Sequence, residues 1–131
     1  MRLSWEEYLM KMAYEIAQFS TCPSAKRGCV IVPYKDENIL VTGYTDAPPG
    51  EETCNRFGCI MKNGCKRSNH AEVNAIAKAA RFGIEINAGH AYIYAEDKRG
   101  KFKGMCNHCK ELFSCVNVRW TLALPHHFMP Q

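Results

Sequence analysis

The chain has 131 residues, of which 47% are hydrophobic and 23% are charged. This length and mixture are typical of a soluble globular protein and exclude a chain of several ordinary domains, so we expect a single domain over residues 1–131. The net charge of +4 at pH 7 is too small to indicate a nucleic-acid-binding protein, but it is compatible with an anionic small-molecule substrate.

The first predicted element is a helix near the N-terminus. Apolar side chains recur at three- and four-residue steps between Trp5 and Ala17, which is the period of an amphipathic helix. Ser4 and Glu7 have the spacing of a capping box at its start. We expect this helix to end near Phe19.

A predicted β-hairpin and a long irregular segment follow. The stretches 29–32 and 39–44 are rich in β-branched residues, and the polar turn 35–38 separates them. The segment 46–68 contains several prolines and glycines and no periodic pattern. A loop of this length is uncommon inside a compact domain and usually needs something to order it.

The second half of the chain alternates helices and strands. We expect a helix over 70–82, a strand over 91–95, a short helix over 106–113 and a strand with one polar face over 116–122, followed by a loose tail over 125–131. Strands that alternate with helices in this way indicate an α/β fold with parallel pairing and helices that cover the sheet.

The most unusual feature of the composition is a count of eight cysteines. No apolar run approaches the roughly 18 residues of a membrane span, and Glu6 and Glu7 stand where an export signal would be apolar. We therefore expect a cytoplasmic protein without membrane association, and disulfides are rare in that compartment. Cysteines at short spacings near histidines then indicate metal binding. The eight are Cys22, Cys29, Cys54, Cys59, Cys65, Cys106, Cys109 and Cys115.

Two of the predicted helices begin with candidate zinc ligands. His70 starts the helix over 70–82, and the Cys106-x-x-Cys109 pair starts the helix over 106–113. One histidine and two thiolates leave a tetrahedral position open for water, which is typical of a catalytic zinc site. Glu72 lies two residues after His70, where its carboxylate can exchange a proton with that water. A pair of core cysteines or a purely structural site is the simpler alternative.

The pattern of His70-x-Glu72 and Cys106-x-x-Cys109 resembles the signature of the zinc deaminases. The chain resembles the cytidine-deaminase-fold superfamily, and within it the deoxycytidylate (dCMP) deaminase family. The resemblance implies a three-layer α/β/α sandwich with a mixed sheet of four to five strands, zinc bound by His70, Cys106 and Cys109, Glu72 as the proton shuttle, and a homo-oligomer. The matching stretches are 4–8, 20–23, 28–32, 43–44, 54–59 and 65–76.

The remaining cysteines divide into two groups. Three lie in the irregular segment and a fourth precedes the first strand, and four thiolates can form a closed structural zinc site that would hold this segment. Some relatives in the family carry a second zinc in this region; free thiols are the alternative. The proposed ligands are Cys22, Cys54, Cys59 and Cys65, with Cys22 the least secure. We expect Cys29 and Cys115 to be small buried core residues.

Three departures from the family pattern bear on the substrate. Thr45-Asp46 replaces the usual Asn-Gly, whose Asn is expected to contact the sugar. The loop over 95–105 is longer than usual, and its Phe102 lies among basic residues that could clamp a phosphate or contact nucleic acid, or could form a solvated hairpin. The chain ends soon after its last strand, so we expect an oligomer to cover the exposed edge.

The resemblance implies hydrolytic deamination of dCMP to dUMP and ammonia. The alternatives are another substrate of the same fold (deoxycytidine triphosphate, a modified base, a small amino-heterocycle or single-stranded nucleic acid) and a non-catalytic zinc-binding module. Nucleic acid ranks below a small-molecule nucleotide because the charge is modest. The candidate substrate contacts are the backbone of Ala71, together with Thr45, Arg67, Lys26 and Arg27.

Overall fold

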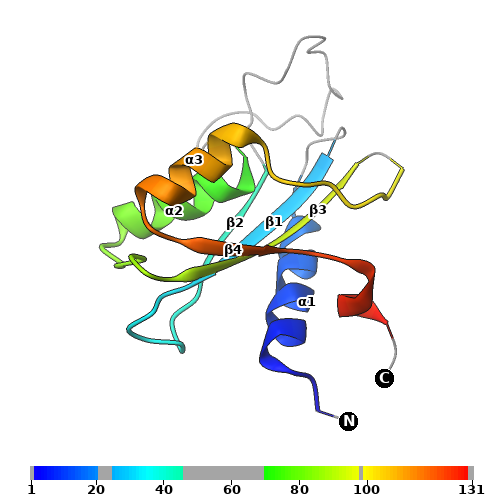
Figure 1. Cartoon of the computed structure of the whole chain (residues 1–131), viewed down its shortest axis with the longest axis horizontal. Coiled ribbons are helices and arrows are strands. Elements are labelled where there is room, and N and C mark those ends of the chain that lie inside the picture. The colour runs from blue at the N-terminus through cyan, green and yellow to red at the C-terminus, as the bar shows by residue number, and fades with distance from the viewer. Residues whose placement is uncertain (1, 21–24, 46–69, 98, 130–131) are drawn as a thin grey trace.

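The computed structural model describes residues 2–20, 25–45, 70–97 and 99–129, which form a sheet between two helical layers (Figure 1). Helix α1 covers one face of the sheet, and α2 and α3 lie together on the other. This is the three-layer α/β/α arrangement that the resemblance implies. In chain order the elements are α1 (Trp5–Ala17), β1 (Ala25–Val32), β2 (Val41–Tyr44), α2 (Ala71–Arg81), β3 (His90–Asp97), α3 (Asn107–Cys115), β4 (Arg119–Leu122) and the 3₁₀ helix η2 (Pro125–Phe128).

The sheet has four strands in the order β2-β1-β3-β4 and is mixed, as expected. The parallel pairing expected in the second half of the chain occurs between β3 and β4. Strand β1 lies between β2 and β3 and is antiparallel to both. It pairs with β3 over all eight of its residues. The sequence prediction started this strand at residue 29 because 26–28 lacks β-branched residues, and it therefore missed half of this long pairing.

Alternation along β1 separates two cores. Cys29 and Ile31 face the core shared with α2 and α3. Val30 and Val32 face the core shared with α1. On β2, Gly43 lets the start of α2 approach closely, because a Cβ at this position would be 2.5 Å from the Ala71 carbonyl oxygen. This close approach positions the N-terminus of α2, where the candidate site lies.

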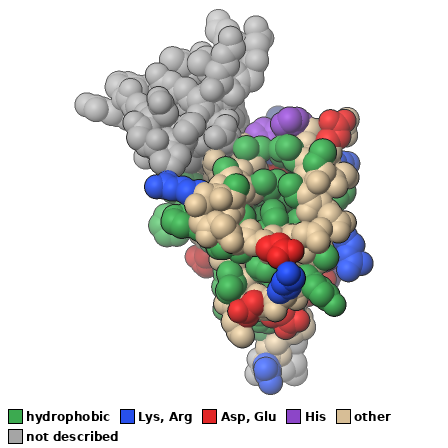
Figure 2. Space-filling view, turned by 90° about the vertical axis from the view of Figure 1, so that its left-hand side faces the viewer, with side chains coloured by type: hydrophobic (Ala, Val, Ile, Leu, Met, Phe, Trp, Pro, Cys, Tyr) green, Lys and Arg blue, Asp and Glu red, His purple; other side chains and the backbone are tan. Residues whose placement is uncertain are grey.

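Figure 2 shows the side of the molecule that lies on the left in Figure 1, with apolar side chains grouped across its centre. The Lys and Arg side chains visible on this face are separated from one another, and some lie beside acidic groups. The described residues of this face therefore form no continuous basic stripe. Among the helices that the structure describes, none is both long enough and apolar enough to cross a bilayer.

The expectation of a loose tail over 125–131 is wrong for its first residues. Pro125–Phe128 is a 3₁₀ helix, and the side chain of His127 is 2% exposed. Its Nδ1 accepts a hydrogen bond from the Leu124 amide at 2.9 Å, and its Nε2 lies 3.0 Å from Glu6 Oε2 at the start of α1. A segment of four residues carries too little periodicity for its sequence to show this docking.

The two cysteines expected in the core differ. Cys29 is fully buried on β1, within the core shared with α2 and α3, as expected. Cys115 is exposed at the C-terminal end of α3, so the prediction that it is a core residue is wrong. The last turn of a helix on the outside of the sheet leaves one side open to solvent, and Cys115 lies on that side.

Candidate active site

Helix α2 presents His70 at its N-terminus. His70 is the N-cap residue in an extended conformation, and its side chain makes no capping hydrogen bond. The ring is therefore free to point away from its own helix. The side-chain Nδ2 of Asn74 donates to the Tyr44 carbonyl at 2.8 Å. This bond and the contact at Gly43 hold the first turn of α2 against β2 and fix the direction of the histidine.

Helix α3 presents the two cysteines in the same way. Cys106 is its N-cap residue, and the Cys106 sulfur accepts a hydrogen bond from the Cys109 amide at 3.4 Å. This contact turns the Cys106 sulfur back over the first helical turn, where Cys109 also lies. Cys109 is buried, whereas Cys106 is partly exposed. The pair therefore has one side toward the core and one side accessible from outside.

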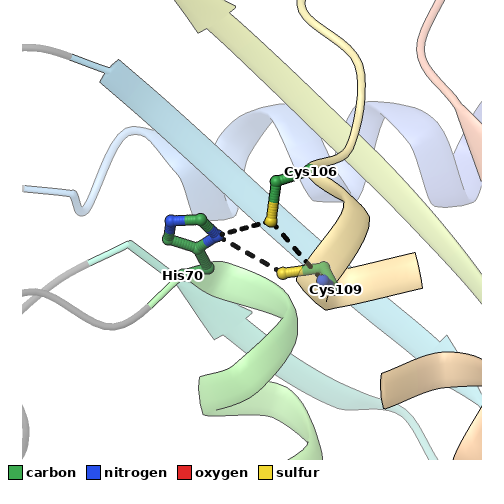
Figure 3. A group of neighbouring side chains, drawn as sticks. All are labelled: His70, Cys106 and Cys109. Atoms are coloured by element: carbon green, nitrogen blue, oxygen red, sulfur yellow. Dashed lines mark hydrogen bonds between the residues drawn. The ribbon is translucent and has the colours of Figure 1, made fainter. Parts of the chain in front are cut away.

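The structure brings these three side chains together, as Figure 3 shows. The Nδ1 atom of His70 lies 3.3 Å from the Cys109 sulfur and 3.4 Å from the Cys106 sulfur. Tetrahedral zinc with ordinary Zn–N and Zn–S bonds would separate a nitrogen from a sulfur ligand by about 3.6 Å. The donor set and its spacing therefore fit zinc, and three protein ligands leave a fourth position for a reactant.

Glu72 lies beside this cluster and is fully buried. Neither carboxylate oxygen has a hydrogen-bond partner among the described residues, and Nη1 of Arg27 lies 3.6 Å from Oε2, which is an ion pair but too long for a hydrogen bond. Burial of a polar group without hydrogen bonds is costly. Within the described part of the chain, the carboxylate of Glu72 therefore has hydrogen-bonding capacity to spare.

Cys109 lies close to this carboxylate. Burial, followed by the charge of Glu72 and the neighbouring Cys106, raises the pKa of the Cys109 thiol. A thiol must lose its proton to bind zinc, and the charge of a divalent cation would offset these effects. Cys106, Cys109 and Glu72 are therefore electrostatically suited to a cation that lies near all three of them.

The predicted substrate contacts are placed differently from one another. Ala71 is buried at the start of α2. Thr45 is buried just after β2, and among the described residues its hydroxyl has no partner. Arg27 reaches into the site, where it pairs with Glu72. Lys26 is exposed and donates to the side chain of Gln18, which follows α1 on the other face of the sheet. Arg67 and the four proposed ligands of a second zinc, Cys22, Cys54, Cys59 and Cys65, lie outside the described residues.

The segment after β3 does not place an aromatic ring in the site. Phe102 bridges to Glu96 on β3 and packs against Tyr94 and Phe128, on the α1 side of the sheet. Its register with β3 gives Phe102 the same face of the sheet as Tyr94. The expectation that this basic segment clamps a phosphate or contacts nucleic acid stays a prediction. Met105, in contrast, is buried in the core that contains Cys109.

A buried carboxylate beside a His-Cys-Cys cluster, at two helix N-termini of an α/β/α sandwich, defines the class of zinc-dependent deaminases. A family model for the cytidine and deoxycytidylate deaminase zinc-binding region matches residues 3–122. The chain belongs to this family.

Curated relatives support the family assignment. ComE operon protein 2 of Bacillus subtilis is 34% identical over 93 residues, which is 70% of this chain and 48% of that protein. The deoxycytidylate deaminase of Schizosaccharomyces pombe is 34% identical over 96 residues, which is 66% of this chain and 29% of that protein. The chain thus spans about half, or less than a third, of the length of these relatives.

Solved structures support the fold. The dCMP deaminase of cyanophage S-TIM5 in apo form matches with a TM-score of 0.69 and 24% identity, over 93% of this chain and 86% of that chain. The cytidine deaminase of Mycobacterium leprae matches with a TM-score of 0.56 and 17% identity, over 99% of this chain and all of that chain. At these identities the likeness shows the shared cytidine deaminase fold alone.

Proposed function

We propose that this chain is a zinc-dependent deaminase that converts dCMP to dUMP and ammonia. The observation that carries the proposal is the fully buried Glu72 beside His70, Cys106 and Cys109. The names of two relatives, both deoxycytidylate deaminases, and a cyanophage structure in complex with dCMP and dUMP support the substrate. The net charge of +4 is compatible with a nucleotide monophosphate.

The residues divide the work of the reaction. His70, Cys106 and Cys109 would hold zinc, which supplies a Lewis acid that makes water nucleophilic near neutral pH. Glu72 accepts one proton from the attacking water and passes it to the ring nitrogen next to C4 of cytosine. It then takes the second proton from the hydroxyl now bonded to C4 and gives it to the departing amine. Ammonia leaves and a carbonyl remains. Burial of Glu72 keeps bulk water from competing for this proton.

The base and sugar would meet the ends of α2 and β2. The Ala71 amide lies in the first turn of α2, where backbone N–H groups have no partner within the helix, so it can bind the ring edge or the new carbonyl. The Thr45 hydroxyl, buried and without a described partner, is a candidate for the sugar. Arg67 stays a candidate for the phosphate, and Lys26 is a weaker one because it faces Gln18.

We also infer a second, structural zinc bound by Cys22, Cys54, Cys59 and Cys65, on the basis of the sequence pattern alone. About two zinc ions per purified chain would support the second site, and about one would contradict it.

We further infer a single domain over residues 1–131, a cytoplasmic location where thiols stay reduced, and a homo-oligomer. The homo-oligomer is supported by β4, an edge strand that pairs only with β3 among the described strands.

The proposed activity is tested by a substrate panel. Zinc-loaded protein is incubated with dCMP, deoxycytidine, deoxycytidine triphosphate, free cytosine and a cytosine-containing single-stranded DNA, and ammonia release is measured. We expect dCMP to have the highest kcat/KM. Turnover of free bases or DNA but not of dCMP would contradict the nucleotide assignment, and turnover of none would favour a non-catalytic zinc-binding module.

A further inference from the structure

Arg27 is a nearly buried arginine in the candidate site. Its side chain is 10% exposed, and the alternation along β1 places it on the same face as Cys29, toward α2 and α3. Its Nη2 donates to the Gly104 carbonyl at 3.3 Å, and its Nη1 lies 3.6 Å from Oε2 of Glu72. One guanidinium thus contacts both the carboxylate and the segment that leads into Cys106.

The opposite charges of Arg27 and Glu72 offset part of the cost of burying each side chain. A fully buried carboxylate is costly unless a compensating charge lies nearby. Within the described part of the chain, Arg27 is the cation paired with Glu72. The neighbouring Lys26 faces Gln18 instead. Backbone pairing holds Arg27 in place, because it lies opposite Ala95 on β3 and its carbonyl accepts from the Thr45 amide at 3.1 Å.

We propose that Arg27 is a positioning residue for Glu72. The guanidinium engages Oε2 and leaves Oε1 for proton transfer. Its rigid fork reaches the Gly104 carbonyl at the same time, and Gly104 precedes Cys106 by two residues. The arginine thereby couples the orientation of the carboxylate to the backbone that carries the cysteine pair. This inference rests on the proposed deaminase function, and it assigns Arg27 to the carboxylate rather than to a substrate phosphate.

The test uses Arg27→Gln and Arg27→Lys, with kcat and KM measured for dCMP and for deoxycytidine. A misoriented proton carrier should lower kcat about 10- to 100-fold for both substrates in Arg27→Gln, with KM changed less than about threefold and zinc content unchanged. Arg27→Lys should be intermediate, because one ammonium cannot make both contacts. The matched control is Arg81→Gln at the exposed C-terminal end of α2, which should leave kinetics unchanged.

Two kinetic results would overturn the proposal. A rise in KM for dCMP alone, with kcat retained, would make Arg27 a phosphate contact. Wild-type kinetics in both variants would remove any role in the reaction. If Arg27→Gln does not fold, Arg27→Lys decides by the same split between kcat and KM. If deoxycytidine is turned over too slowly to measure, the split for dCMP decides.

A second readout does not depend on activity. The free energies of unfolding of the wild type, Arg27→Gln, Glu72→Gln and the double variant form a double-mutant cycle. Each single variant leaves one buried charge unpaired. We therefore expect the double variant to lose less unfolding free energy than the sum of the losses of the two single variants. Additive losses would overturn the pairing. If the zinc-loaded wild-type protein turned over no cytosine substrate, the proposed function would fail, and this cycle would still decide the role of Arg27.

Discussion

The Nδ1 atom of His70 lies 3.3 Å from the sulfur of Cys109, although 39 positions separate the two residues in the chain. The contact exists because α2 and α3 both begin at the same edge of the sheet, so that their first turns face each other. Helix α2 comes after β2 in the chain, and α3 comes after β3. Both strands end at the edge of the sheet where the site lies. The geometry of the His-Cys-Cys cluster is therefore a consequence of the topology, and the role of each residue can be tested separately.

Loss of one cysteine should remove zinc from this cluster. We expect Cys109→Ser to bind about one zinc ion per chain fewer than the wild type, because a hydroxyl replaces a thiolate ligand, and to melt at a lower temperature. Cys115→Ser is the matched control, since that thiol is exposed at the other end of the same helix. Metal analysis by mass spectrometry checks both. Equal zinc content in the two variants would argue against Cys109 as a ligand.

Gly43 should be intolerant of a side chain. A Cβ there would lie 2.5 Å from both the Ala71 carbonyl oxygen and the Ala75 amide nitrogen. We expect Gly43→Ala to destabilise the protein by about 1–3 kcal/mol and to reduce activity by displacing the first turn of α2. Gly104→Ala is the control, because its Cβ would meet nothing closer than 3.9 Å. Urea unfolding measures both, and equal stabilities would contradict the close packing.

His127 should stabilise the fold by its contacts outside the candidate active site. His127→Ala removes the contacts to Glu6 and to the Leu124 amide, and we expect it to cost about 1–3 kcal/mol without a change in zinc content. His126→Ala, at an exposed neighbouring position, should be neutral. Thermal unfolding of the two variants gives the comparison. A neutral His127→Ala would mean that this docking contributes nothing to stability.

Local patterns predicted much of the fold. The period of α1 and its capping box, the turn between β1 and β2, and the helices α2 and α3 follow from neighbouring residues, and the structure confirms them. The position of β1 between β2 and β3 could not be read in this way, because it depends on a pairing between residues about 65 positions apart. Phe102 differs, because its bridge partner Glu96 is close in the chain, but the basic residues around it carry no signal of the face that this register gives it.

The site was predictable where chemistry is tied to spacing. His70, Glu72 and the cysteine pair stand at fixed offsets from helix starts, and the structure brings them together. The sequence analysis placed Arg27 only among the candidate substrate contacts. Its ion pair with Glu72 depends on which way β1 faces, and a single polar residue before a short apolar run carries no signal of that direction.

The central claim is that Glu72 carries the proton in a zinc-dependent deamination. Its most direct test is the rate of ammonia release from dCMP by zinc-loaded Glu72→Gln, beside Glu111→Gln on the exposed side of α3 as the control. Replacement of a proton carrier by an amide should lower kcat by about 10²- to 10⁴-fold and leave zinc content unchanged, with the control at wild-type activity. A Glu72→Gln variant that retained zinc and wild-type kcat would contradict the mechanism.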